Sequence, residues 1–250
     1  MVAERPHLSV VIPVYNESRR LPATMTRVLG YLRDAPHAWE VVVADDGSTD
    51  TSAEIVRSFA ESDARVRLVQ CPHRGKGAAV RAGMLAATGT WRLFTDADLS
   101  IELSELPRFF EVPADVAIGS RQVTGARRIG EPSSRHLMGR VFNLCAQALL
   151  VPGITDTQCG CKLFSDTAAQ HVFSASRIDG FAFDVEVLFL AQKAGLRVRE
   201  VPLTWHYRPG SRLRLSTGIS AFGQLLEIWM QARRGRYREI ESSAPLGHRE

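Results

Sequence analysis

The sequence has no long apolar run, and this shortage limits the kind of protein it can encode. No stretch reaches the ~18–20 uninterrupted apolar residues that a membrane-spanning helix needs. Residues 1–7 also contain no apolar run of the kind found in a secretory signal. We therefore expect a soluble protein, or one that touches a membrane only at its surface.

Excess charge and cysteine are also scarce. Lys and Arg total 31 against 27 Asp and Glu, and the formal charge of +4 is too small to indicate a nucleic-acid partner. The four cysteines lack the paired CxxC spacing of a zinc site, so a reduced, cytoplasmic setting is the simpler interpretation. Arginines gather at 121–140 and 197–238, a pattern that suits a phosphate ligand, an anionic membrane surface or an ordinary solvated face.

The sequence does contain a regular alternation of apolar β-rich runs and helical patterns. Strands are expected at 8–14, 40–44, 66–69, 91–95, 115–119 and 196–201. Helices are expected at 22–33, 50–60, 76–87, 134–150, 180–194 and 216–233. Strands that alternate with helices imply an α/β fold with a mostly parallel sheet, and 250 residues fit one such domain.

Four segments are expected along the chain. They are an N-terminal extension at 1–7, an α/β domain at 8–215, an amphipathic helix at 216–238 and a disordered tail at 239–250. The segment at 125–132 is expected to be a flexible basic loop. The apolar stripe of the amphipathic helix leaves two alternatives, packing on the domain or lying in a lipid interface.

Polar clusters follow three of the expected strands, at 15–17, 45–46 and 96–98. In open α/β sheets ligands bind outside the carboxyl ends of the strands. Asp96 and Asp98 are one residue apart at such an end, and Mg²⁺ or Mn²⁺ prefers oxygen ligands that it can share with a diphosphate. Asp-x-Asp alone is a weak signal because loops are rich in Asp, but this position after a strand favours a metal site.

Two further motifs each allow two interpretations. The Gly-Lys-Gly sequence at 75–77 lacks Walker spacing, yet a Lys at a helix N-terminus attracts phosphate; the alternative is a flexible loop with a solvated Lys76. The Asp-Asp-Gly-Ser sequence at 45–48 suits either a turn before a helix or carboxylates that accept hydrogen bonds from a nucleoside.

Taken in order, the motifs resemble a known family. The sequence SVVIPVYNE at 9–17, DDGSTD at 45–50, GKG at 75–77 and DAD at 96–98 resembles inverting glycosyltransferase family two, which has the GT-A fold. GSR at 119–121, DTQCG at 156–160, KLF at 162–164 and GFAFDVE at 180–186 resembles its dolichyl-phosphate glucosyltransferase branch. The resemblance covers roughly residues 8–215.

The resemblance implies a nucleotide-sugar donor, with UDP-glucose as the expected one. The implied donor-binding residues are Pro13, Tyr15, Glu17, Asp45, Asp46, Lys76 and Asp96. Within this set the first loop and Asp45 would bind the nucleobase, and Lys76 and Asp96 the ribose–diphosphate region. Asp98, together with Asp96, would hold the Mg²⁺ or Mn²⁺ ion.

The resemblance also implies a lipid acceptor, polyprenyl or dolichyl phosphate. Arg121 and Arg135 would hold its phosphate, because guanidinium forks match phosphate oxygens; structural ion pairs are the alternative. Gln158, Ser211 and Arg212 are further expected acceptor contacts, although 211–212 also suits an ordinary surface loop.

The sequence leaves the roles of three carboxylates open. Asp156 lies where relatives with hydroxyl acceptors keep their catalytic base, and here it serves either orientation or loop structure. Asp184 and Glu186 are two residues apart and cannot share one helix face, so only one should point into the site, and Glu186 is preferred.

The expected activity is therefore transfer of a sugar, with inversion, to a lipid phosphate at the cytoplasmic face of a membrane. Ser100 stands where the related mannosyl branch has a metal-binding Gln, which favours the glucosyl branch without fixing the sugar. Cys161 stands where the glucosyl branch usually has Phe. The alternatives are a polyprenyl-phosphate mannosyltransferase, a family-two enzyme with a sugar hydroxyl acceptor, and a nucleotide-sugar-binding protein without catalysis.

Overall fold

The structure is a computed structural model that describes residues 5–130, 133–207, 215–238 and 240, without the side chains of 133–137 and 215–219. Expected segments that fall elsewhere, including 211–212 and most of the tail at 239–250, lie outside the described residues. No helix within the described residues is long and apolar enough to cross a membrane.

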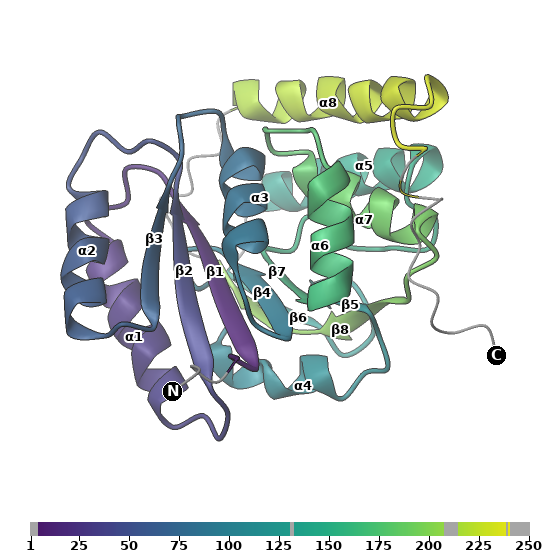
Figure 1. Ribbon diagram of the computed structural model, residues 1–250. Helices are drawn as coiled ribbons and strands as arrows, with labels where there is room; N and C mark the ends of the chain where they lie inside the picture. The colour runs from purple at the N-terminus through teal and green to yellow at the C-terminus, as the bar shows by residue number, and fades with distance from the viewer. Residues whose placement is uncertain (1–4, 131–132, 208–214, 239, 241–250) are drawn as a thin grey trace.

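A seven-stranded sheet with the order β3-β2-β1-β4-β7-β5-β8 forms the centre of the fold (Figure 1). Its strands are β1 (Leu8–Val14), β2 (Trp39–Asp45), β3 (Val66–Gln70), β4 (Trp91–Thr95), β5 (Val116–Ser120), β7 (Cys161–Ser165) and β8 (Val198–Pro202). All neighbours are parallel except β7, which runs antiparallel between β4 and β5. Two short strands, β6 (Arg127–Ile129) and β9 (Thr204–His206), pair separately.

Helices cover both faces of the sheet (Figure 1). They are α1 (Leu21–Arg33), α2 (Ser52–Ser62), α3 (Lys76–Ala86), α4 (Pro107–Phe110), α5 (Ser133–Leu149), α6 (Asp166–Ala175), α7 (Phe183–Lys193) and α8 (Leu215–Arg233), with a 3₁₀ turn at Leu103–Glu105. Successive side chains of β1 point to opposite faces: Val11 joins the core under α3, α6 and α7, whereas Val10 and Ile12 join the core under α1 and α4. A strand buried on both faces explains the continuous apolar run at 8–14.

The expected mostly parallel α/β fold is confirmed. β1 and β4 have the bounds expected from the sequence, and the other expected elements differ at their ends by up to three residues. The expected elements do not include α4, β7, α6 or β9, and β6 lies within the segment expected to be a flexible loop. β7 was missed because Lys162 interrupts its short apolar run.

Both ends of the described chain pack on the domain. Arg5 Nε donates to the carbonyl of Thr88 at 2.9 Å, and His7 N donates to Ala38 O at 2.7 Å. Ile240, the one described residue of the expected tail, is buried, and its carbonyl accepts a hydrogen bond from the ring of His171 at 3.0 Å. The expected domain boundaries remain a prediction.

Candidate active site

The loops that follow β1, β2 and β4 meet at one edge of the sheet. These strands are neighbours in the order β2-β1-β4, and the last residue of β1, Val14, is paired with the last residue of β2, Asp45. The polar clusters at 15–17, 45–46 and 96–98 therefore lie side by side at the carboxyl ends of the strands, as their positions in the sequence predict.

Asn16 joins the first loop to the second. Its φ of 51° is in the left-handed region, which Asn tolerates better than most residues. Its side-chain oxygen accepts hydrogen bonds from Thr49 N at 2.7 Å and Asp50 N at 3.2 Å. Glu17 N donates to Ser52 Oγ at 2.9 Å. The residues DGSTD after β2 thus hold the loop after β1 as well as starting α2.

Asp45 and Asp46 differ in what they contact. Asp45 is buried and accepts hydrogen bonds from Ser48, including one from its backbone N at 3.2 Å. Asp46 accepts from Arg74 N at 2.9 Å and Gly75 N at 3.0 Å, and it also contacts the ring of His73 at 2.8 Å. Both oxygens of Asp46 accept hydrogen bonds from the 73–75 turn, so Asp46 holds this turn beside the site. Its expected contact with a donor remains a prediction.

An aromatic pair lies beside Asp46. The rings of Tyr15 and His73 are stacked, with centroids 4.0 Å apart and planes 13° from parallel. Tyr15 was expected in the site, but His73 was missed because a lone His in a loop carries no sequence pattern. The two rings form a flat surface that suits a planar nucleobase.

The first turn of α3 places the positively charged side chain of Lys76 in the site. Lys76 Nζ lies 2.6 Å from Asp96 Oδ1. Gly77 N donates to Asp179 O at 2.8 Å, and a Cβ at either glycine of the motif would collide with the backbone at 178–179. The glycines are therefore required for this close approach. Burial lowers the pKa of Lys76, but Asp96, Asp184 and Asp98 together raise it by more, so Lys76 remains protonated.

Asp96 and Asp98 sit directly after β4 as expected. A Cβ at Gly160 would overlap the Asp96 carboxylate, so only glycine leaves room for that side chain, and Asp96 N donates to Gly160 O at 3.1 Å. Asp98 Oδ1 accepts from Ser100 N at 3.0 Å. These two half-exposed carboxylates lie next to a phosphate-attracting Lys.

The two carboxylates fit a divalent cation only if substrate completes its coordination. Within the described residues, no group of three or more His, Cys, Asp or Glu side chains is placed to hold a metal ion. Mg²⁺ is commonly held by one or two carboxylates, with water and substrate phosphates as its other ligands. Asp96 and Asp98 have the chemistry of such a site.

On the other side of the site, Arg121 and Asp156 form a bidentate pair. Arg121 Nε lies 2.7 Å from Asp156 Oδ2, and its Nη2 lies 2.8 Å from Oδ1. Asp156 is fully buried; burial raises its pKa, but Arg121 lowers it by more, and the net pKa lies below the usual value. The guanidinium of Arg121 also lies 5.4 Å from the ring of Trp205. Arg121 is thus engaged by a carboxylate rather than left open for a phosphate.

The segment that carries Asp156 is held from two sides. Glu200 of β8 accepts hydrogen bonds from Thr155 N at 2.8 Å and Asp156 N at 3.0 Å. Asn143 of α5 accepts from the Thr157 hydroxyl at 2.6 Å. Gln158, an expected acceptor contact, follows this braced segment and is half-buried.

Lys162 and Asp184 form a second buried pair. Lys162 is fully buried, donates to Asp184 Oδ1, and donates to Cys159 O at 2.8 Å. Burial raises the pKa of Asp184 more than Lys162 and Lys76 lower it. Lys162 was not expected in the site, although a lysine inside the apolar run at 161–164 is itself a sign of a buried partner.

The preference for Glu186 over Asp184 is wrong. Glu186 accepts hydrogen bonds from Arg177 N, Ile178 N and the hydroxyl of Tyr237, the last at 2.6 Å. It therefore joins α7 to the chain after α6 and after α8. Asp184, on the other face of α7, is the carboxylate near Lys76 and Asp96.

Three expected acceptor contacts are not located. Arg135 lies in the first turn of α5, but its side chain is outside the description. Ser211 and Arg212 lie outside the described residues. Their roles remain predictions.

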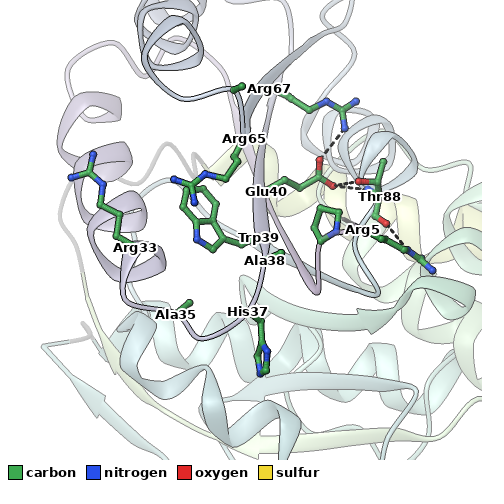
Figure 2. A pocket seen from close by; sticks show the side chains of 12 residues that line it. Arg5, Arg33, Ala35, His37, Ala38, Trp39, Glu40, Arg65, Arg67 and Thr88 are labelled. Atoms are coloured by element: carbon green, nitrogen blue, oxygen red, sulfur yellow. Dashed lines mark hydrogen bonds and ion pairs between the residues drawn. The ribbon is translucent and has the colours of Figure 1, made fainter. Parts of the chain in front are cut away.

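A hollow of about 570 Å³ lies away from this site, at the amino ends of β1 and β2 (Figure 2). Arginines line it, but carboxylates and carbonyls already engage three of them: Arg67 pairs with Glu40, Arg65 with Asp63, and Arg5 with Thr88. Trp39 is covered by the guanidinium of Arg65, 3.7 Å from the ring centroid. The hollow has charge but none of the motif residues, so we do not assign the reaction to it.

The mostly parallel sheet with carboxylate loops at one edge, together with a family-model match, defines a glycosyltransferase. Residues 9–173 match the family model described as glycosyl transferase family 2, and the chain belongs to this family.

Relatives with curated names indicate which branch of the family the chain resembles. The chain is 34% identical to a dolichyl-phosphate beta-glucosyltransferase of Dictyostelium discoideum, with 89% of this chain and 76% of the relative aligned. It is 36% identical to the Homo sapiens protein of the same name, over 82% of this chain and 69% of the relative.

Solved structures share the fold. Glucosyl-3-phosphoglycerate synthase from Mycobacterium tuberculosis, in complex with UDP, has a TM-score of 0.65 at 19% identity, covering 91% of this chain and 81% of that chain. A Pyrobaculum calidifontis mannosyltransferase in complex with GDP-Man and Mn²⁺ has a TM-score of 0.59 at 19% identity, covering 96% and 69%. The mostly parallel sheet flanked by helices is thus the GT-A fold.

Proposed function

We propose that the protein transfers glucose from UDP-glucose to a polyprenyl or dolichyl phosphate, with inversion at the anomeric carbon. The observation that carries the proposal is the cluster of Lys76, Asp96 and Asp98 at the end of β4, where a protonated amine and two carboxylates are partly open to ligands. Curated relatives that cover most of the chain bear the name dolichyl-phosphate beta-glucosyltransferase, which supports this choice of sugar and acceptor.

The donor side has the groups that a nucleoside diphosphate needs. The stacked rings of Tyr15 and His73 offer a surface for uracil, with Pro13, Glu17 and the buried Asp45 around it. Lys76, at the N-terminus of α3, would neutralise diphosphate oxygens. Asp96 and Asp98 would hold Mg²⁺ or Mn²⁺, which supplies further positive charge to the departing diphosphate.

The chemistry needs no strong base from the protein. A phosphate monoester has its second pKa near ~6, so the acceptor is already mostly a dianion at neutral pH. One of its oxygens attacks the anomeric carbon of glucose, a new C–O bond forms, and the bond from that carbon to the diphosphate breaks, releasing UDP. Lys76 stabilises the charge that develops on the leaving diphosphate.

Asp156 acts as an orienting group in this scheme. Its carboxylate is buried, both its oxygens accept from Arg121, and its pKa is lowered, all of which argue against a general base. Arg121 can meet the acceptor phosphate only by sharing or leaving Asp156. Arg135, Gln158, Ser211 and Arg212 are the other proposed acceptor contacts.

We place the reaction at the cytoplasmic face of a membrane, with the protein in peripheral contact. A lipid phosphate presents its charged head at the bilayer surface, where a peripherally bound protein can reach it. The four cysteines are free thiols, which suits a reducing compartment.

A transfer assay tests the proposal. Purified protein is incubated with labelled UDP-glucose or GDP-mannose and polyprenyl phosphate, with Mg²⁺, Mn²⁺ or EDTA. We expect label from UDP-glucose in the lipid fraction, and none with EDTA. Label from GDP-mannose would indicate the mannosyl alternative. Donor binding without transfer would contradict the proposal and favour a non-catalytic binding protein.

A second arm addresses the rival acceptor class, a sugar hydroxyl. Transfer to a hydroxyl needs a carboxylate base, so Asp156→Asn would abolish that reaction. Under our proposal the same variant weakens the fold around Arg121 but retains transfer to the phosphate. Complete loss of transfer in a folded Asp156→Asn protein would contradict the orienting role.

A further inference from the structure

Exposed apolar side chains are concentrated on two helices. Among the described residues, the large apolar side chains that are exposed are Phe110, Ile129, Met138, Val141, Leu144, Leu149, Leu226 and Met230. Six of these eight lie on α5 or α8. Scattered single residues of this kind are ordinary on a protein surface, but a cluster indicates an interaction site.

α5 is apolar on both its sides. Phe142, Ala146 and Leu150 point into the core. Met138 and Val141 are exposed, 44% and 47%, and Leu144 is the most exposed of the eight at 61%. At 100° per residue these side chains occupy adjacent sectors on the side away from the core, where a helix in contact with water usually carries polar residues.

α8 continues this surface. Its residues Leu225 and Ile228 are buried against the core, whereas Leu226 and Met230 are exposed one turn apart. The two helices contact each other through Phe142 and Phe222, whose rings pack edge to face with centroids 5.3 Å apart. We call the exposed residues Met138, Val141, Leu144, Leu149, Leu226 and Met230 the α5–α8 face.

Both helices are tied to the acceptor side of the active site. Asn143 of α5 accepts hydrogen bonds from Thr157, next to Asp156. Gln224 of α8 accepts from Ala182 N at 2.9 Å, two residues before Asp184. In Figure 1, α8 and α5 lie at the same end of the molecule, and α4 with Phe110 lies at the opposite end.

The charges around this face are mostly positive. Exposed arginines are found at position 140 of α5, at position 233, where α8 ends, and at positions 234, 236 and 238 after it. Glu227 is the one acid among the described side chains of 220–238, and it is exposed. The guanidinium of Arg233 lies 4.2 Å from the ring of Trp229. Long cationic side chains beside apolar and aromatic ones are typical of surfaces that lie in the interface of an anionic bilayer.

We propose that the α5–α8 face rests in the interface of an anionic membrane and presents the acceptor side of the active site to the lipid phosphate. Apolar side chains enter the boundary between headgroups and acyl chains, and the arginines meet anionic headgroups. The proposal rests on the proposed function only in the identity of the acceptor. The binding itself follows from the apolar and charged surface.

Vesicle sedimentation tests the binding. The double variant Leu144→Glu/Leu226→Glu places a charge on each helix, and Phe110→Glu is the matched control, an exposed apolar residue at the far end of the molecule. On vesicles of phosphatidylcholine and phosphatidylglycerol, we expect the double variant to bind about tenfold more weakly or worse than wild type, and the control to bind normally. Neutral vesicles or high salt should weaken wild-type binding.

Three outcomes would overturn the proposal. They are wild type that does not sediment with anionic vesicles, equal binding by wild type and the double variant, and a wild-type dimer that the double variant dissociates without any vesicle binding. The last result would make the face a subunit interface. If circular dichroism shows that the glutamate variant does not fold, Leu144→Ser/Leu226→Ser is used in its place. We expect this variant also to bind vesicles more weakly than wild type.

Acceptor length separates this proposal from the proposed function. With a short, water-soluble prenyl phosphate, the double variant should transfer glucose as fast as wild type. With polyprenyl phosphate in vesicles, its kcat/KM should fall by about tenfold or more. If wild type binds vesicles but transfers no sugar to either acceptor, the proposed function is wrong and the membrane-binding role of the α5–α8 face stands. If wild type transfers sugar to the short acceptor but does not bind vesicles, the proposed function stands and the membrane-binding role is wrong.

Discussion

The donor side and the acceptor side of the site hold their charges in different ways. On the donor side, the side chains of Lys76 and Asp96 are 22% and 35% exposed, and they pair at 2.6 Å. On the acceptor side, Lys162 and Asp184 are 0% and 5% exposed, and Asp156 is 0% exposed beside Arg121 at 17%. The donor-side ion pair is therefore partly open to water, whereas the acceptor-side ion pairs are largely shielded from it.

The difference indicates different uses. A partly exposed ion pair contributes little net free energy to stability. Each of its members can therefore leave the other and bind a ligand instead. A buried pair has already lost its water, and removing one partner leaves an uncompensated charge. We infer that the donor-side charges serve the substrate directly, whereas the acceptor-side pairs hold the backbone around it.

The largest effect on activity is expected at Asp98. Asp98→Asn should lower kcat by about a thousandfold, because several kcal/mol of charge stabilisation correspond to about three factors of ten. Its thermal stability should stay close to wild type, since Asp98 is half-exposed. The transfer assay and a thermal melt measure the two effects. Asp63→Asn, in an exposed pair with Arg65, is the control. Near-normal turnover by Asp98→Asn would contradict the metal site.

The largest effect on stability is expected at the Lys162–Asp184 pair. Asp184→Leu should lower the free energy of unfolding by about 3–5 kcal/mol, because it leaves Lys162 charged and buried. Lys162→Met/Asp184→Leu should recover much of this loss. Urea unfolding measures both, with Arg65→Met as an exposed-pair control. If the double variant is no more stable than the single one, the buried charge is not the cause.

Arg121 should give a pH-dependent effect. In wild type the pKa of folded Asp156 lies below its unfolded value, so the pair stabilises the fold above about pH 4 and loses this contribution as the pH falls through the folded pKa. In Arg121→Met, burial still raises the pKa of Asp156, and only Lys162 and the backbone N–H of residue 121 still lower it. We expect the net shift to be upward, so that stability falls as the pH rises above about 4.

The destabilisation by Arg121→Met should therefore grow between pH 4 and pH 7, to about 3 kcal/mol. Urea unfolding of wild type and variant at several pH values measures it. Arg197→Met serves as the control, because Arg197 pairs with Asp115 in a more exposed position. A difference between the proteins that does not change with pH would contradict the coupling of Arg121 to Asp156.

A smaller effect is expected at Gly160. A methyl group there would overlap the Asp96 carboxylate, so Gly160→Ala should displace Asp96 and lower kcat/KM for the donor by about tenfold or more. Gly223→Ala is the matched control, because no atom lies within 4 Å of its added Cβ. Alanine in that helix should leave activity unchanged and stabilise by up to about 1 kcal/mol. Equal activities of the two variants would show that Asp96 tolerates the methyl group.

The donor side could be predicted from the sequence because its residues come from loops directly after strands. The apolar runs at 8–14 and 91–95 locate β1 and β4 to the residue, and parallel neighbours bring their carboxyl ends together. The proximity of Asp96 and Asp98 to Lys76 could therefore be expected without knowledge of long-range packing. The strain at Asn16 and the stacking of Tyr15 on His73 carry no such local pattern.

The acceptor side could not be predicted to the same extent because its pairs join distant segments. Arg121 meets Asp156, 35 residues away, and Lys162 meets Asp184 across β7 and α7. The antiparallel strand β7 inserts between β4 and β5, and no spacing along the chain indicates that insertion. The choice between Asp184 and Glu186 likewise depended on which face of α7 meets Lys162.

The sequence by itself determined the alternation of strands and helices, the ends of the strands and the order of the donor motifs, because these follow from apolar periodicity and local turn chemistry. Only the tertiary structure decided that Arg121 is bound by Asp156, that Asp46 holds a turn, and that α5 and α8 expose apolar side chains together. Each of these depends on burial and on contacts between segments far apart in the chain, and a charge or an apolar side chain acquires its role only from what surrounds it.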